Sequence, residues 1–87
     1  MDIRFPAIEV MNTNLDSVSF PADIDGKRTR CAISLEALQD NFGGNDMDPV
    51  ECLRANRAAI ESKAASLIRR GRFEKDGSIL IRSGDGA

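Results

Sequence analysis

The chain has 87 residues, of which 41% are apolar and 30% charged, so we expect one globular domain with a thin core, and neither a disordered chain nor a second domain. The net charge of −2 gives the whole molecule no attraction to nucleic acid, although the first 51 residues carry ten acidic against four basic side chains and the remainder carries eight basic against four acidic ones. Residues 1–6 do not have the basic and apolar runs of a secretion signal, and no segment approaches the roughly 20 apolar residues that span a bilayer, so we expect a cytoplasmic protein with no membrane partner.

The first part of the chain is predicted to hold an extended segment, residues 1–14, followed by a β-hairpin. Apolar residues alternate over 17–24 and again over 27–33, and Asp25-Gly26 between them is the dipeptide favoured by two-residue type I′ turns. Counting outward from that turn places both apolar faces on the same side of the hairpin, whereas a slip of one residue would turn one of them to solvent. The predicted pairs are Ile24 with Lys27, Ala22 with Thr29, Phe20 with Cys31 and Val18 with Ile33, with Asp23 and Arg28 paired on the other face.

Pro21 predicts which side of the hairpin is free. In this register it lies opposite Arg30 in a non-hydrogen-bonded pair, where its missing N–H would have pointed away from the partner strand. We therefore expect residues 17–24 to be an edge strand, and a third strand to add on the far side of residues 27–33.

Two helices are predicted to follow the hairpin. The first lies between Ser34, a good N-cap, and Gly43, which has the place of a C′ glycine. The second begins after Asp48 with Pro49 as its first residue, and it is expected to run unbroken to Arg70. Its apolar stripe consists of Val50, Leu53, Ile60, Ala64, Leu67 and Ile68.

The last strand is predicted at residues 78–82, after a turn at Asp76-Gly77, and residues 83–87 are expected to form a flexible tail. The expected fold is a single α+β domain over the whole chain, with the element order β-β-α-α-β. Its small sheet is expected to have three strands of antiparallel type, with both helices packed on one face.

Three segments together resemble one bacterial family. They are FPADIDGKRTRCAISLEAL at residues 20–38, Asn41-Phe42-Gly43, and LRANRAAIE at residues 53–61. The family they resemble is catalogued as domain of unknown function family 1488, and the similarity covers about residues 15–83. Its most specific part is Phe-Pro-Ala-Xaa-Ile/Val-Asp-Gly-Lys/Arg followed by Cys-Ala-Ile-Ser. The resemblance implies a small, single-domain cytoplasmic protein, and it brings no activity, ligand or catalytic residue to carry over.

The residue types needed for catalysis are scarce. The sequence has no His, which removes the commonest general base and the usual partner of a Ser or Cys nucleophile, so we expect no enzyme, no catalytic residue and no cofactor. Asp46, Asp48 and Glu51 do not have the spacing of a calcium loop, so we expect no metal either. Cys31 alternates into the apolar face, whereas Cys52 lies near a helix start, where a reactive thiolate can form. A minor thiol-dependent activity at Cys52 is therefore one alternative.

Arg57 falls within the apolar stripe of the second helix, where a charge must find a partner or reach past the sheet edge. Glu61, one turn later, is the expected partner, and Asp40 on the first helix is another. The pair Arg57 and Glu61 is either a structural contact or part of a subunit or partner interface.

Arg69, Arg70, Arg72 and Lys75 form the basic cluster of the sequence. They are candidates for contact with a polyanion, which they would bind through its phosphates with strong salt dependence. Cations at a helix C-terminus also stabilise the helix, which explains the cluster without a ligand. Phe73, the aromatic residue among them, is expected in the core.

These features favour a non-enzymatic protein-binding or regulatory module, whose partner is another protein or a second copy of itself in a homodimer. The features that favour this function are the missing catalytic groups, the thin core and an open sheet edge at the last strand, which is a ready site for strand addition. Nucleic-acid association through residues 69–75 is the alternative from a different class. No small-molecule substrate is inferred.

Overall fold

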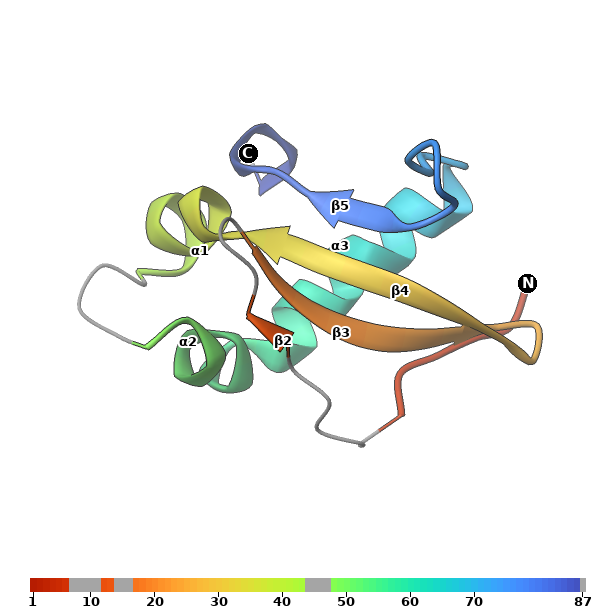
Figure 1. The fold of residues 1–87 in the computed structure, drawn as a ribbon, viewed down its shortest axis with the longest axis horizontal. Coiled ribbons are helices and arrows are strands. Elements are labelled where there is room, and N and C mark those ends of the chain that lie inside the picture. The colour runs from red at the N-terminus through yellow and green to blue at the C-terminus, as the bar shows by residue number, and fades with distance from the viewer. Residues whose placement is uncertain (7–11, 14–16, 44–47, 87) are drawn as a thin grey trace.

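The computed structural model describes residues 1–6, 12–13, 17–43 and 48–86, which form a mixed sheet with helices packed on one of its faces (Figure 1). The main path of the sheet is β1 (Ile3–Arg4), β3 (Ser17–Ile24), β4 (Lys27–Ser34) and β5 (Ile79–Ile81), and β2 (Asn12–Thr13) also pairs with β3. The helices α1 (Leu35–Phe42), α2 (Pro49–Ala55) and α3 (Arg57–Arg69) all lie between β4 and β5 in the chain. The predicted α+β class is confirmed.

The sheet differs from the three-stranded antiparallel sheet that the sequence predicted. β5 runs parallel to β4, with Cys31 opposite Ile79 and Ile33 opposite Ile81. The chain passes through all three helices between these strands, and a crossover of that length can return a strand in the same direction. The prediction of three strands was also wrong, because two short N-terminal strands add to the other side of β3.

The hairpin of β3 and β4 has the predicted register at all of its pairs. Asp25 and Gly26 have φ angles of 50° and 84°, the positive values that a type I′ turn requires. Asp23 and Arg28 form the predicted ion pair on the outer face, with 2.6 Å between Oδ1 and Nε. The turn also holds the N-terminus, because Asp25 donates its backbone N–H to Asp2 O and accepts the Asp2 N–H on its side chain, both at 2.8 Å.

Pro21 lies opposite Arg30 as predicted, but the expectation that β3 is an edge strand was wrong. On the side of β3 away from β4, β1 pairs with Asp23 and Ile24, and β2 pairs with residues 18–19. Pro21 therefore lies in the gap between the part of β3 that pairs with β1 and the part that pairs with β2. Neither of these strands would accept a hydrogen bond from an N–H at this position, so proline is tolerated there. The third strand on the far side of β4 was predicted correctly.

The helix ends follow the capping residues. Ser34 Oγ accepts the N–H of Ala37 at 3.0 Å, and Gly43 closes α1 in the left-handed conformation with φ 66°. Asp48 Oδ1 accepts the N–H of Val50 at 2.9 Å at the start of α2. Both predicted starts and the predicted end of the first helix are confirmed.

The predicted continuous helix over residues 49–70 is interrupted at Asn56, so the described residues form three α-helices rather than two. Asn56 leaves helical geometry with φ −117° and ψ 22°, and its side-chain Nδ2 donates to the carbonyl oxygen of Cys52 at 2.9 Å. A side-chain amide that competes for a helix carbonyl is the usual reason for Asn to favour a helix end over a helix interior.

The core lies between the helices and the apolar face of the hairpin. The strands contribute Val18, Phe20, Ala22, Cys31, Ile33, Ile79 and Ile81. The helices contribute Ala37, Leu38, Cys52, Leu53, Ile60, Ala64, Leu67 and Ile68. The predicted stripe on α2 and α3 is thus confirmed, except that Val50 is only half-buried.

Residues 83–86, predicted as part of a flexible tail, form the short 3₁₀ helix η2 (Ser83–Gly86) beside α1 (Figure 1). Asn41 Nδ2 donates to the carbonyl oxygen of Ser83 at 3.0 Å, and Ser83 Oγ donates to Glu36 Oε1 at 3.4 Å. No helix among the described residues is long and apolar enough to cross a membrane.

Candidate functional site

The sheet is incomplete beside β4. β5 pairs only with Cys31, Ala32 and Ile33, and within the described ranges no strand pairs with residues 27–30 on that side. We call residues 27–30 the open β4 edge. The segment that leads from α3 into β5 passes beside this edge without pairing with it, and the space between them is a hollow of about 540 Å³.

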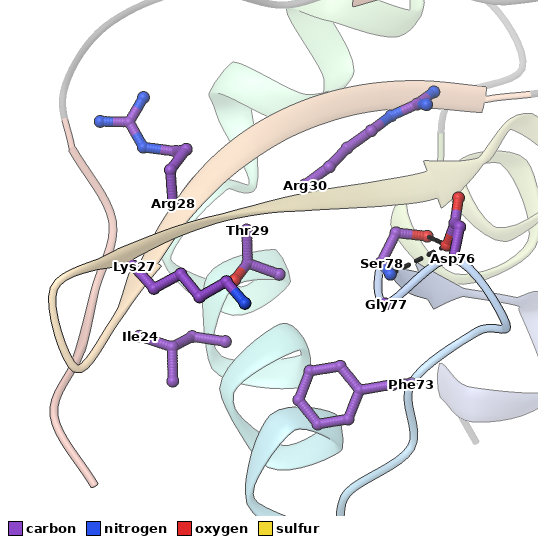
Figure 2. Close-up of a pocket in the computed structure, with 9 residues that line it drawn as sticks. All are labelled: Ile24, Lys27, Arg28, Thr29, Arg30, Phe73, Asp76, Gly77 and Ser78. Atoms are coloured by element: carbon purple, nitrogen blue, oxygen red, sulfur yellow. Dashed lines mark hydrogen bonds between the residues drawn. The ribbon is translucent and has the colours of Figure 1, made fainter.

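The hollow has an apolar side and a basic side. Figure 2 shows Arg28 and Arg30 on one side of β4, and Ile24 and Phe73 on the other. The described residues that line the hollow are Ile24, Lys27, Arg28, Thr29, Arg30, Phe73, Asp76, Gly77 and Ser78. Because residues alternate along a strand, Thr29 and Lys27 share the side of Ile24, and the two arginines share the outer side (Figure 2).

Phe73 is the apolar feature of the hollow. The prediction that it lies in the core was wrong, because 42% of its surface is exposed. Among the described residues, Met1 is the other large apolar side chain with comparable exposure. An exposed ring beside an unpaired strand edge is a contact surface for an apolar side chain of another molecule.

The charges around the hollow are unevenly satisfied. Arg28 is bound to Asp23, whereas Lys27 and Arg30 make no direct ion pair with any described residue. Asp76 accepts both the hydroxyl and the N–H of Ser78, at 2.6 and 2.9 Å, and the hydroxyl contributes most to lowering the pKa of the Asp76 carboxyl, which the charge of Arg30 also helps to lower. Asp76 thus serves the turn, and the rim facing an incoming ligand is basic.

The turn that borders the hollow is held by its own hydrogen bonds. Glu74 donates its backbone N–H to Ser78 O at 2.8 Å, and Gly77 donates to Glu74 O at 2.9 Å. Gly77 has a φ of 86°, which favours glycine at this position. The hollow is therefore bounded by two preformed elements, the strand on one side and this turn on the other.

Arg57 and Glu61, predicted as a structural pair or an interface, do lie together. Arg57 Nε donates to Glu61 Oε2 at 3.0 Å, and Arg57 Nη2 donates to the carbonyl oxygen of Pro6, also at 3.0 Å. Glu61, not Asp40, is the partner in the ion pair. The contact fastens the N-terminal segment to α3, which is a structural use of the arginine.

Different hollows are lined by different members of the predicted basic cluster. Arg70 and Arg72 line a second hollow together with Lys63, which the sequence argument did not include. Lys75 lines a different hollow, on the outer face of the sheet, and Arg69 is exposed at the end of α3 and lines neither.

Both thiols are buried. Cys31 has no exposed surface, and burial raises the pKa of its thiol to about 12. Cys52 is also unexposed, with its Sγ 3.6 Å from the carbonyl oxygen of Phe42; burial raises the pKa of this thiol too, against a smaller opposite effect of the Asn56 amide. A group with raised pKa in the core has little thiolate at neutral pH, so this geometry does not favour the thiol-dependent alternative.

The acidic residues considered for a metal have other contacts. Asp48 caps α2, Glu51 binds Arg54 at 2.9 Å, and Asp46 lies outside the described residues. Among the residues that the structure describes, no three His, Cys, Asp or Glu side chains are grouped closely enough to hold a metal ion.

The open β4 edge and Phe73 were not among the predicted site residues. Residues 27–30 stay open because the last strand pairs with only three residues of β4. The number of residues that two strands pair cannot be predicted from the sequence of either strand alone. The available signal was the difference between an eight-residue strand and a short last strand preceded by Gly77.

Comparisons with known proteins agree on one family. A family model described as "Protein of unknown function (DUF1488)" matches residues 3–81. The uncharacterized protein YrdB of Escherichia coli K12 is 33% identical over 80 residues, covering 91% of this chain and 94% of that protein, and the YrdB protein of Shigella flexneri gives the same values.

A solved structure has the same fold. The crystal structure of a DUF1488 protein of unknown function from Shewanella loihica PV-4 superimposes with a TM-score of 0.78 at 22% identity, covering 93% of this chain and 94% of that one. The similarity predicted from residues 20–38 is thereby confirmed. This chain belongs to the bacterial DUF1488 family.

Proposed function

We propose that this protein is a non-enzymatic, cytoplasmic protein-binding module that accepts an extended segment of a partner as an added strand along the open β4 edge. The observation that carries the proposal is the open β4 edge, four residues without a strand partner on the side away from β3, which lies beside an exposed Phe73 and a basic rim. Strand addition uses main-chain hydrogen bonds for affinity and alternate side chains for specificity.

The backbone of β4 is oriented for such pairing. Ile24 and Lys27 close the two-residue turn as a hydrogen-bonded pair, and antiparallel pairs alternate from there. The N–H and C=O groups of Arg28 therefore point away from β3, into the hollow. A partner strand can bond to them without displacing any described strand.

Side-chain alternation predicts what the partner segment contains. A residue of the added strand beside Thr29 would place its side chain on the apolar side, against Ile24 and Phe73. The residues before and after it would face Arg28 and Arg30 on the outer side. The hollow thus fits an extended segment with the order acidic, apolar, acidic.

A second copy of the chain is a poorer occupant of this edge. Symmetric antiparallel pairing with a second copy, centred on Thr29 so that the outer faces stay on one side, would place Arg28 directly opposite Arg30 of the second copy. Like charges on directly opposite residues destabilise a strand pair. We therefore propose a monomer that binds a different protein, rather than a homodimer formed through this edge.

The absence of enzymatic function in the proposal is supported by the side chains available. The sequence has no His, and both thiols lie in the core with raised pKa values. The hollow beside β4 has one carboxylate, Asp76, whose hydrogen bonds hold the turn. A binding role would use the groups that are exposed here, namely the backbone of the open β4 edge, the guanidinium groups of Arg28 and Arg30, and the ring of Phe73.

The test is a titration of the full chain, observed by amide NMR, with a capped peptide that alternates Glu and Val. We expect saturable shifts at residues 27–30 and Phe73, and none with a peptide that alternates Lys and Val. Arg28→Pro removes the outward N–H, whereas the matched variant Arg28→Gln removes the same charge and keeps the N–H. The proline variant should bind at least tenfold more weakly than the glutamine variant.

Two results would contradict the proposal. One is equal binding of the acidic and basic peptides, or equal binding by Arg28→Pro and Arg28→Gln. The other is light scattering at micromolar concentration that gives a dimer instead of a 9.5 kDa species, with Lys27→Glu altering the dimer. That outcome would assign the edge to self-association.

A further inference from the structure

A second hollow, of about 430 Å³, is lined by residues of α3, by Arg70 and Arg72 just after α3, and by Gly84 of η2. Three cations and two hydroxyls line it: Lys63, Arg70 and Arg72, with Ser62 and Ser66. We call it the α3 hollow. It shares no lining residue with the hollow beside β4.

The spacing along α3 places these side chains together. Ser62, Ser66 and Arg70 are four residues apart and follow one face of the helix, with Lys63 next to them. Arg72 joins them because α3 ends at Arg69, and Gly71, with a φ of 70°, turns the chain back. The turn is closed by the N–H of Arg72, which donates to the carbonyl oxygen of Leu67 at 3.0 Å.

The three cations carry uncompensated charge. None of them forms an ion pair with a described residue, whereas the neighbouring Arg82 is bound to Glu74 at 2.7 Å. Attraction to the helix C-terminus accounts for Arg70 and Arg72, but that effect is confined to the last turn of a helix. Lys63 lies in the middle of α3 and needs another explanation.

We propose that the α3 hollow binds the phosphate group of a small phosphomonoester. Such a group carries a charge near −2 and presents three acceptor oxygens, which match three cationic donors and two hydroxyls. A volume of about 430 Å³ is larger than one phosphate needs and lies within the range of small-ligand pockets, so the organic part of the ligand also has room.

A nucleic-acid chain is the less suitable occupant. No aromatic side chain lines the α3 hollow for bases to stack on, and the chain as a whole is negatively charged. Arg69 and Lys75, which a phosphate backbone crossing this surface would be expected to use, lie outside the hollow.

The experiment is a titration of the full chain with inorganic phosphate and with ribose 5-phosphate, in a phosphate-free buffer at constant ionic strength set with sodium chloride. Amide NMR should show saturable shifts over residues 62–72, with ribose 5-phosphate binding at least as tightly as inorganic phosphate. Arg72→Gln and Lys63→Gln should each weaken binding tenfold or more. Arg69→Gln, which removes the same charge from the same helix end outside the hollow, should leave binding unchanged.

Three results would overturn the proposal. Shifts that chloride reproduces, or that do not saturate, would show general screening of charge. An equal loss in Arg69→Gln and Lys63→Gln would show that position in the hollow does not matter. Tight binding of a thymidine oligonucleotide with a steep salt dependence, weakened by Arg69→Gln and Lys75→Gln, would assign the surface to nucleic acid. Lys63→Gln changes a half-buried residue in the middle of α3, away from the turn at Gly71, so it decides the matter if Arg72→Gln does not fold.

Discussion

Arg57 bridges two distant parts of the chain, because its guanidinium binds Glu61 one turn away on α3 and the carbonyl oxygen of Pro6 in the N-terminal segment, both at 3.0 Å. The side chains of the pair are 29% and 23% exposed, so water competes only partly for these bonds. The arginine that the sequence placed in an apolar stripe is thus held by a carboxylate and a backbone carbonyl.

We expect Arg57→Leu to lower the free energy of unfolding by about 1–2 kcal/mol, because it leaves a half-buried carboxylate and a carbonyl without their donor. Urea denaturation measures the change. Arg54→Leu removes the exposed partner of Glu51 and should cost about 0.5 kcal/mol or less. If Arg57→Leu were instead more stable and abolished a protein contact, the arginine would belong to an interface.

Phe73 should be nearly neutral for stability and decisive for peptide binding. Phe73→Ser is expected to change the free energy of unfolding by less than about 1 kcal/mol, because the ring is substantially exposed. The same variant should lose binding of the Glu–Val peptide. Phe20→Ala, in the core, should cost about 3–5 kcal/mol in the same denaturation experiment. A large stability loss in Phe73→Ser would mean that the ring serves the fold.

Both cysteines should react slowly in the folded protein. At pH 8, labelling with a chromogenic disulfide reagent is expected to be about 100-fold or more slower than in urea, because reaction requires opening of the core. Cys52→Ala and Cys31→Ala identify which thiol reacts. Rapid labelling of Cys52 in the native state would restore the thiol-dependent alternative.

Alkaline pH should destabilise the protein through Cys31. The unfolded thiol ionises around its ordinary pKa of 9.0, whereas the folded thiol keeps its proton up to about 12. The unfolded state therefore binds fewer protons in this interval, and stability that is complete below pH 9 is lost as the pH rises towards 12. Between pH 10 and 11 we expect a loss on the order of 1 kcal/mol that Cys31→Ala does not show. Equal slopes in the two proteins would contradict the assignment.

The parts of the fold that were predictable are those in which neighbouring residues agree. Asp25-Gly26 set the turn and the alternating apolar residues set the register, so every pair of the hairpin followed from local sequence. The capping residues Ser34 and Asp48 located two helix starts for the same reason.

The parts that were not predictable depend on distant segments. The direction of β5 is decided by the path of three helices, and a three-residue strand such as Ile79–Ile81 has the same composition in either direction. The break at Asn56 depends on whether its side-chain amide bonds to the carbonyl oxygen of Cys52 or to solvent. Lys63 joined Arg70 and Arg72 only once the ends of α3 were known, which is why the sequence grouped Arg70 and Arg72 with Arg69 and Lys75 instead.

The long excursion between β4 and β5 has a consequence for synthesis. On the ribosome, β3 and β4 emerge together and can form their hairpin at once, whereas β5 is made only after the three helices that follow β4. Until then all eight residues of β4 lack a strand partner on that side, whereas in the folded protein β5 pairs with three of them. Synthesis on neighbouring ribosomes is therefore the stage at which β4 is most prone to pair with a strand of another copy.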